Sequence, residues 1–319
     1  MNVATDHLTA PEGLQPFAPG DVFVGATQLN SPDDDHAGRG RIIQYDADLN
    51  LKGVLWVEGT THLVYGLTFA PDGILWAFDP WAWTAVRVTP EGEQLPNRRF
   101  AQRAFSMVHF AKDDTLLFTE SLEGDNQPVP LTTRHPVLPG ETTKLGDGDI
   151  YRFDAGGTLL EVHDPDVHGG MSGSMGITHS VMSADGDSVI YVSETGSRLM
   201  RYDVESGRQL QDIRSYPDGE RQMYFDLAAM SGARLLISMG NRLDLLSESG
   251  DELHTYPLEG FGWSIVALSS DERYAYIGNW FTGQLGKFDL AEESFIAMTD
   301  VCQKCMAGLA VFHGVAKSK

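Results

Sequence analysis

The chain has 319 residues, of which 42% are hydrophobic and 21% are charged, an ordinary composition for a soluble protein. Its formal net charge of −22 argues against nucleic acid and membrane surfaces as partners, because both are recognised through Lys and Arg. No apolar run approaches the roughly 18 residues that span a membrane. The first residues, MNVATDHLTAPEGLQPF, lack the basic start and apolar core of a signal peptide, so we expect a cytoplasmic protein.

A hairpin unit recurs along the chain with a period of about 40 to 46 residues, apart from one longer interval. It consists of a short apolar strand, a tight turn and a second apolar strand. In chain order the copies are GLTFAPDGILWAFD (66–79), MVHFAKDDTLLFTES (107–121), HSVMSADGDSVIYVSET (179–195), DLAAMSGARLLISMGN (226–241) and IVALSSDERYAYIGN (265–279). A further strand that usually ends in an aromatic-Asp pair also recurs, as in IIQYDADLNLKG (42–53) and LMRYDVESGRQL (199–210).

Six copies of this further strand predict an all-β fold, a six-bladed β-propeller with four-stranded blades. The sixth blade must combine both ends of the chain: residues 307–314 as the inner strand, 21–27 as the second, and 40–57 as the outer two. We expect one propeller domain over 21–315, with tails at 1–20 and 316–319. Insertions at 28–40 and 122–148 are expected over one face. A β-sandwich or a two-domain β protein is the competing interpretation.

Polar residues end the second strand of five hairpins. They are Asp79, Glu120, Glu194, Asn241 and Asn279. Carboxylate and amide oxygens are the ligands of hard cations, so these residues predict a divalent metal site for Ca²⁺ or Mg²⁺. The alternative is that polar side chains simply end these strands at the solvent.

His179 and Asp226 begin the first strands of two neighbouring blades. A carboxylate beside an imidazole raises its basicity, so the pair predicts a general base, with Glu194 as a further catalytic residue. A buried structural His–Asp pair is the alternative. The Gly- and Met-rich stretch HGGMSGSMGIT (168–178) leads directly to His179 and is predicted to form a pocket wall.

Aromatic residues flank the same loops and predict a small-molecule substrate with apolar or aromatic surface. The candidates for substrate contact are His62, Trp81, Trp83, Tyr224, Trp263 and Trp280. Packing of these rings beneath the long loops is the alternative. The pair Cys302 and Cys305 is a weak zinc signal, and two packed thiols are favoured over a redox role or a disulfide.

The segment HSVMSADGDSVIYVSET resembles the blade repeat of the SMP-30/gluconolactonase family within the NHL-like superfamily. That resemblance implies a divalent metal in the central channel and hydrolysis of lactones. Glu194 stands at the position of an Asp ligand, but Thr178 and Ser106 stand at positions of Asn ligands, and Ala307 or Tyr65 at that of a Glu. Most of the implied metal site is therefore replaced.

The segment LLFTES and the pair His179 and Glu194 also resemble virginiamycin B lyase and its relatives. This second resemblance implies a His and a Glu on one blade that act with Mg²⁺ in an elimination. The sequence thus predicts a metal-assisted hydrolase or lyase that acts on a small, partly aromatic ester, lactone or ether. The alternative is a propeller that binds a ligand or protein without catalysis.

Overall fold

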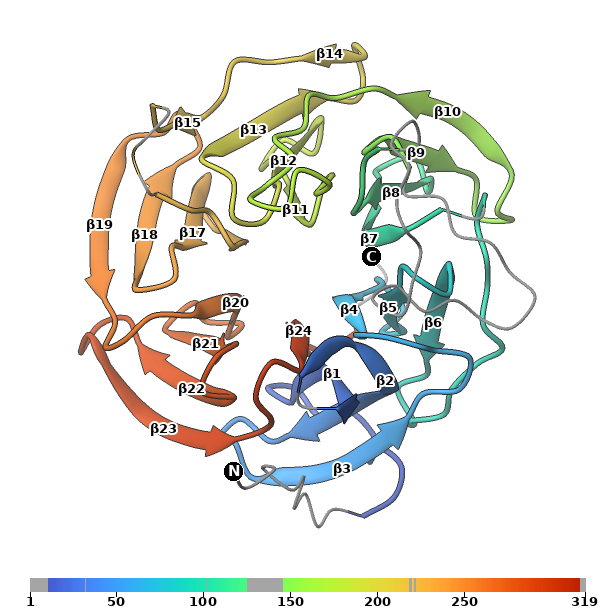
Figure 1. Cartoon of the computed structure of the whole chain (residues 1–319), viewed down its shortest axis with the longest axis vertical. Coiled ribbons are helices and arrows are strands. Elements are labelled where there is room, and N and C mark those ends of the chain that lie inside the picture. Colours follow the sequence, from blue (N-terminus) through green and yellow to red (C-terminus); the bar gives the residue numbers. More distant parts are fainter. Residues whose placement is uncertain are drawn as a thin grey trace. The chain divides into compact units, whose positions relative to one another are not determined.

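The computed structural model describes residues 11–31, 33–101, 103–124, 146–217, 220 and 222–315, with His36 described by its backbone alone. These residues form β-strands and no α-helix, which confirms the predicted all-β class. The strands form six antiparallel sheets, the blades of a six-bladed β-propeller (Figure 1). No helix long and apolar enough to cross a membrane occurs in the described part of the chain. By its internal contacts the chain divides into two compact units.

The first unit contains the described residues 11–31, 33–101 and 265–315. It has three sheets, each written here from the inner strand outwards. The first sheet contains β24 (Met306–Val311), β1 (Val22–Ser31), β2 (Asp34–Tyr45) and β3 (Leu51–Trp56), and the second, middle sheet contains β4 (Tyr65–Phe69), β5 (Leu75–Asp79) and β6 (Thr84–Val88). The third sheet contains β20 (Trp263–Leu268), β21 (Tyr274–Asn279), β22 (Gln284–Asp289) and β23 (Ser294–Asp300). Strand β20 begins two residues before this unit. The middle sheet has an irregular fourth strand, because residues 94–98 bond to β6.

The sheet that contains β24 and β1 joins the two ends of the chain, as predicted. Val22 pairs with Val311, and Gly25 pairs with Gly308. The predicted insertion at 28–40 extends this sheet, because β1 and β2 continue to pair through it as far as Ser31 and Asp34.

The second unit contains the described residues 103–124, 146–217, 220 and 222–264. It also has three sheets, again written from the inner strand outwards. The first contains β7 (Phe105–Phe110), β8 (Leu116–Glu120), β9 (Ile150–Phe153) and β10 (Leu159–His163), and the second contains β11 (His179–Met182), β12 (Ser188–Val192), β13 (Arg198–Asp203), β14 (Arg208–Gln209) and β15 (Arg214–Ser215). The third contains β16 (Asp226–Met230), β17 (Arg234–Ser238), β18 (Arg242–Ser247) and β19 (Glu252–Pro257). Strands β14 and β15 share the outer edge of β13. Strand β11 contacts both β7 and β16, so the three inner strands are neighbours.

Burial explains the strand sequences. The second strands β5, β8 and β12 are buried along their whole length, because each sheet is covered on both faces. Their sequences LWAFD, LLFTE and SVIYV are accordingly almost continuous apolar runs. The outer strand β23 instead alternates between exposed and partly buried residues, as a strand with one solvated face should. The predicted insertion at 122–148 lies mostly outside the described residues, and the single-domain boundaries remain a prediction.

Candidate acid–base site

The structure brings together the three predicted catalytic residues in the second unit. His179 is the first residue of β11, Asp226 is the first residue of β16, and Glu194 follows the end of β12. The charge of Glu194 interacts with those of both His179 and Asp226. The cluster arises because β11 is hydrogen-bonded to β12 and lies beside β16.

His179 is buried but has no hydrogen-bond partner for its ring. Only 8% of the residue is exposed, and neither Nδ1 nor Nε2 has a partner among the described residues. Buried polar atoms in folded proteins are nearly always paired, and an exception calls for an explanation. An imidazole held in this way has a nitrogen available to accept a proton from a bound molecule.

Glu194 is a half-buried carboxylic acid at the same site. Burial raises the pKa of its carboxyl, and the nearby charge of Asp226 raises it further, whereas His179 acts in the opposite direction. Thr178 positions this residue, because the Glu194 backbone N–H donates to Thr178 Oγ1 at 2.7 Å. Thr178 Oγ1 in turn donates to Val192 O at 3.2 Å, so one hydroxyl connects the start of β11 to the exit of β12.

Two backbone hydrogen bonds place Asp226 near Glu194. The Tyr224 N–H donates to Gly196 O at 2.9 Å, and the Thr195 N–H donates to Tyr224 O at 3.1 Å. These bonds join the loop that leaves β12 to the segment that enters β16. Asp226 itself is buried, and its Oδ1 accepts the Leu227 N–H at 2.7 Å. The predicted role of Asp226 in orienting His179 remains a prediction.

Backbone strain lies beside the cluster. Thr195 has a φ of 65°, a left-handed conformation that a β-branched residue rarely adopts. Its Oγ1 accepts the Met171 N–H at 2.8 Å, which fastens a small hairpin closed by a bridge between Gly169 and Met175. Such strain is concentrated at functional sites. No pattern in the sequence pointed to Thr195, whereas the Gly- and Met-rich pattern did point to the segment that contains Met171.

Glu120 has a different environment from Glu194. Its Oε2 accepts three backbone N–H groups, from Asp147 and Gly148 at 3.1 Å and from Asp149 at 3.3 Å. Arg103 Nη1 lies 3.6 Å from its Oε1. Burial raises the pKa of Glu120 to about 7, against the opposing effects of Arg103 and these N–H groups. Glu120 thus fixes the segment that returns to β9.

Two further strand-end residues, both in the first unit, fix turns. Asp79 is fully buried, and its oxygens accept the backbone N–H groups of Thr61, His62, Trp81 and Ala82. Burial raises the pKa of this carboxyl, and those four N–H groups oppose the rise. Asn279 likewise binds the backbone just after its strand, because its Oδ1 accepts the N–H groups of Phe281 and Thr282 at 3.0 Å. Asn241, in the second unit, is exposed.

Three of the five residues predicted as metal ligands already bind backbone groups, and the metal site remains a prediction. The oxygens of Asp79, Glu120 and Asn279 already accept backbone N–H groups, which a cation would have to displace. Ser106 Oγ also donates to a backbone oxygen, that of Ile177. Among the described residues, no group of three or more His, Cys, Asp and Glu is arranged to hold a metal ion.

The aromatic residues predicted to contact substrate lie mostly in the core. Trp81, Trp83, Tyr224 and Trp263 are buried, and Trp280 is half-buried. The buried ring of His62 lies 5.6 Å from that of Trp81, centroid to centroid. These positions give the rings a packing role, and their contact with a substrate remains a prediction.

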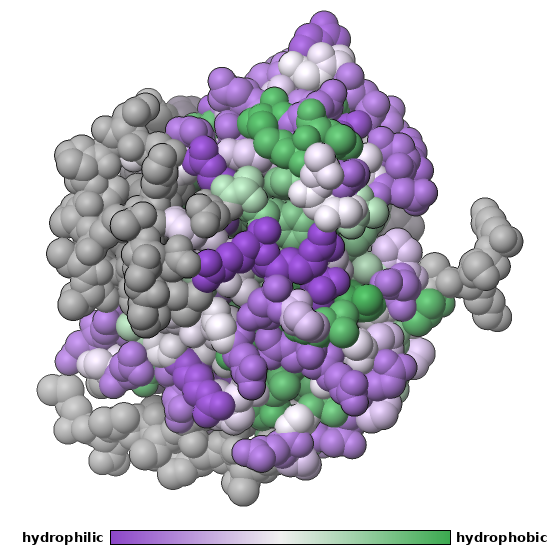
Figure 2. Space-filling view, turned by 90° about the vertical axis from the view of Figure 1, so that its right-hand side faces the viewer, coloured by the Kyte–Doolittle hydropathy of each residue, from purple (hydrophilic) through white to green (hydrophobic). Residues whose placement is uncertain are grey.

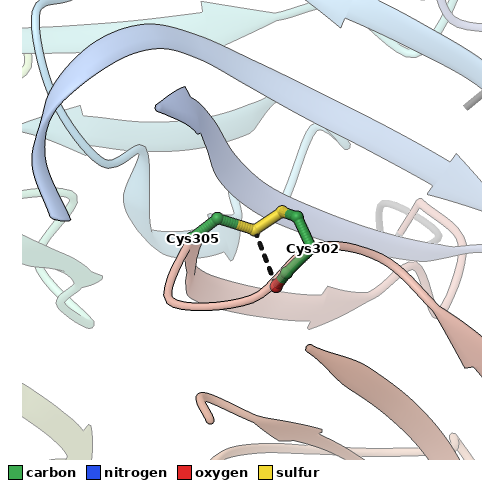
Figure 3. The surroundings of a disulfide bond; sticks show 2 residues. All are labelled: Cys302 and Cys305. Carbon is green, nitrogen blue, oxygen red and sulfur yellow. Dashed lines mark hydrogen bonds between the residues drawn. A yellow bond between two sulfur atoms is a disulfide. The ribbon is translucent and has the colours of Figure 1, made fainter. Parts of the chain in front are cut away.

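Cys302 and Cys305 form a disulfide (Figure 3). The favoured expectation of two packed thiols is therefore wrong. The two residues flank a tight turn, so their side chains lie close enough to bond.

Comparisons with known proteins support the fold. No protein-family model matches the chain, and no curated protein matches it in sequence. A chain in the crystal structure of a nidogen/laminin complex has a TM-score of 0.64 at 12% identity, covering 92% of this chain and 98% of that one. A protein of unknown function from Bacteroides caccae has a TM-score of 0.61 at 13% identity, covering 93% and 100%.

A third solved structure is a catalytically inactive histidine-to-alanine variant of virginiamycin B lyase from Staphylococcus aureus with quinupristin. Its TM-score is 0.54 at 12% identity, and the match covers 91% of this chain and 87% of that one. At these identities the three similarities establish the propeller fold alone.

Proposed function

We propose that the second unit carries the active site of a lyase that acts on a small, partly aromatic ester, lactone or ether. In this proposal His179 is the general base and Glu194 is the general acid. The observation that carries it is the buried His179 ring, whose two nitrogens have no hydrogen-bond partner in the described part of the chain, beside a carboxyl with a raised pKa. Two titratable groups with different environments in one site are the usual arrangement for acid–base catalysis.

The reaction is a β-elimination. A ring nitrogen of His179 takes the proton from the carbon next to the substrate carbonyl. The electron pair of that C–H bond forms a C=C bond, and the C–O bond at the β carbon breaks with its pair on the oxygen. Glu194, which its raised pKa keeps protonated to a higher pH than usual, donates a proton to the leaving oxygen. In a lactone the same step opens the ring.

Two further observations support a lyase. Asp79, Glu120 and Asn279, three of the five predicted metal ligands, already accept backbone N–H groups, so every step is assigned to the side chains of the cluster. The inactivity of a histidine-to-alanine variant of virginiamycin B lyase, a structure with the same fold, favours a histidine-dependent elimination. Asp226 supports the acid role, because its charge raises the pKa of Glu194.

Substitution at the cluster tests the proposal with a panel of β-acyloxy, β-alkoxy and β-aryloxy carbonyl compounds. His179→Ala should lower kcat for every substrate by about 10²- to 10⁴-fold, the usual contribution of a general base. Glu194→Gln should lower kcat strongly for alkoxide leaving groups and little for nitrophenoxide, which leaves without a proton. Exposed His254 and Glu259 provide matched controls, and His254→Ala and Glu259→Gln should leave kcat unchanged.

The pH profile gives a second readout. A general acid works only while protonated, so the rate for alkoxide substrates should fall as the pH rises through the pKa of Glu194. Asp226→Asn removes a negative charge that raises this pKa, so the falling limb should move to lower pH.

The proposal fails if His179→Ala retains full kcat, or if Glu194→Gln affects all leaving groups equally. If the folded wild type turns over no substrate in the panel, the protein is instead a binding propeller.

A further inference from the structure

The Cys302–Cys305 disulfide lies in the first unit, in the turn that leads into β24 (Figure 3). The chain has two cysteines in total, and both are in this bond. A disulfide that closes so short a segment constrains the unfolded chain much less than a bond between distant residues does. Global stability is therefore a weak explanation for this bond.

The two sulfur-bearing residues differ in accessibility. Cys302 is half-buried and is followed by the exposed residues Gln303 and Lys304, whereas Cys305 is only 1% exposed and belongs to a core cluster. Thiol–disulfide exchange requires a thiolate to reach one sulfur of the bond. Cys302, which packs against the same core cluster but is the less buried of the two residues, is where we expect that attack.

The turn also accommodates the reduced form. Cys305 Sγ lies 3.0 Å from Cys302 O, within the distance at which a thiol donates to a carbonyl (Figure 3). If the bond opens, the buried Cys305 thiol therefore has an acceptor in place and need not be left unpaired.

The turn is bonded to two other segments of the first unit. The Lys304 N–H donates to Trp280 O at 2.8 Å, and the Val301 N–H donates to Gly283 O at 2.8 Å. The Thr27 N–H of β1 donates to Cys305 O at 3.0 Å. Packing is close, because a Cβ added at Gly283 would lie 2.5 Å from the Cys302 carbonyl carbon. A change in the turn would therefore reach both the loop 279–283 and β1.

We propose that Cys302 and Cys305 form a redox-active site that exchanges with small dithiols and disulfides and that controls the order of the loop 279–283. A dithiol attacks Cys302 Sγ as its thiolate, which forms a mixed disulfide and releases Cys305 as a thiolate that takes up a proton. The second thiol of the reagent then forms a cyclic disulfide and releases Cys302. The protein gains two electrons and two protons, and the dithiol is oxidised. The site is independent of the acid–base cluster.

Native reduction of the full chain tests the proposal. Dithiothreitol should release two thiols per chain while the circular dichroism spectrum stays that of the folded protein. Hydrogen exchange should then become faster at the amides of Thr27, Val301 and Lys304, and in the loop 279–283. The amides of β16 and β17 in the second unit serve as the internal control and should not change.

Two matched variants identify the sulfur that reacts. The Cys302 thiol left in Cys305→Ser should react with iodoacetamide about tenfold faster than the Cys305 thiol left in Cys302→Ser, because Cys302 is the less buried residue. The proposal is overturned if the bond is reduced only at denaturant concentrations that unfold the chain. It is also overturned if reduction leaves hydrogen exchange unchanged, or if the two single-thiol variants react at the same rate.

Discussion

The polar residues that end the second strands occupy similar sequence positions but differ in their hydrogen bonds. Asp79 and Glu120 accept several backbone N–H groups each, so they hold the loops that follow. Among the described residues no backbone N–H group donates to the Glu194 carboxyl, and the Glu194 backbone N–H donates to Thr178. Whether a strand-end carboxyl binds backbone groups therefore depends on the path of the neighbouring loop. Burial raises the pKa of all three carboxyls.

Glu120 provides the clearest pH test at the residue scale. Its pKa rises from 4.5 in the unfolded chain to about 7 in the folded chain. Between these values the folded chain holds a proton that the unfolded chain has released, so the free energy of unfolding should fall as the pH rises from 4.5 through 7. Glu120→Gln removes this contribution, which is on the order of 3 kcal/mol at most.

Urea unfolding of both proteins from pH 4 to pH 8 measures the effect, with Glu259→Gln at an exposed position as the control. The difference in unfolding free energy between Glu120→Gln and the wild type should change in favour of the variant as the pH rises. A constant difference across this range would show that Glu120 titrates at the same pH in both states.

At the scale of the element, β10 is an unusual outer strand. In the described part of the chain it pairs with β9 alone, and three of its residues, Leu159, Leu160 and Val162, are large exposed hydrophobics. Apolar surface is visible in the upper part of the face drawn in Figure 2, the side on which β10 runs in Figure 1. Exposed apolar edge strands favour pairing between chains, which the net charge of −22 opposes.

High salt should therefore reveal self-association through β10, because it screens the charge repulsion between chains. Leu160→Lys should lower the sedimentation coefficient at high salt and change the free energy of unfolding by less than about 0.5 kcal/mol. Leu253→Lys is the matched control, since Leu253 is equally exposed at 50% but is the only large exposed hydrophobic described on β19. Equal effects of the two substitutions would remove β10 as the cause.

At the scale of the whole molecule, the pairing of β24 with β1 makes folding depend on both ends of the chain. A chain cut after Val301 lacks the inner strand of this sheet and should lose cooperative unfolding. A synthetic peptide of residues 302–315 should restore it, with stabilisation that grows by about 1.4 kcal/mol per tenfold increase in peptide above the dissociation constant.

Near-UV circular dichroism follows this complementation. A peptide with Gly308→Val is the control and should fail, because even a Cβ at Gly308 would lie 2.9 Å from Tyr65 Cα. If the shortened chain unfolds cooperatively without peptide, the closing strand is dispensable.

The sequence predicted the fold better than the site, for a physical reason. Blade strands and their Asp-Gly turns are local patterns, so the repeats identified the six sheets and even the sheet shared by both ends. The strand-end residues form a recognisable set in the sequence, but five of the backbone N–H groups that bind Asp79 and Glu120 come from residues 17 to 29 positions away. The strained backbone of Thr195 and the Cys302–Cys305 disulfide depend on local backbone angles, which the residue pattern does not predict.

His179 and Glu194 are proposed to catalyse an elimination. Turnover of a β-acyloxy carbonyl substrate in water labelled with oxygen-18 tests it most directly, with mass spectrometry of both products. Elimination breaks the C–O bond at the β carbon, so we expect an alkene, a released carboxylate without label, and loss of both in His179→Ala. Label in the carboxylate, together with an alcohol in place of the alkene, would show hydrolysis and rule out the proposed elimination.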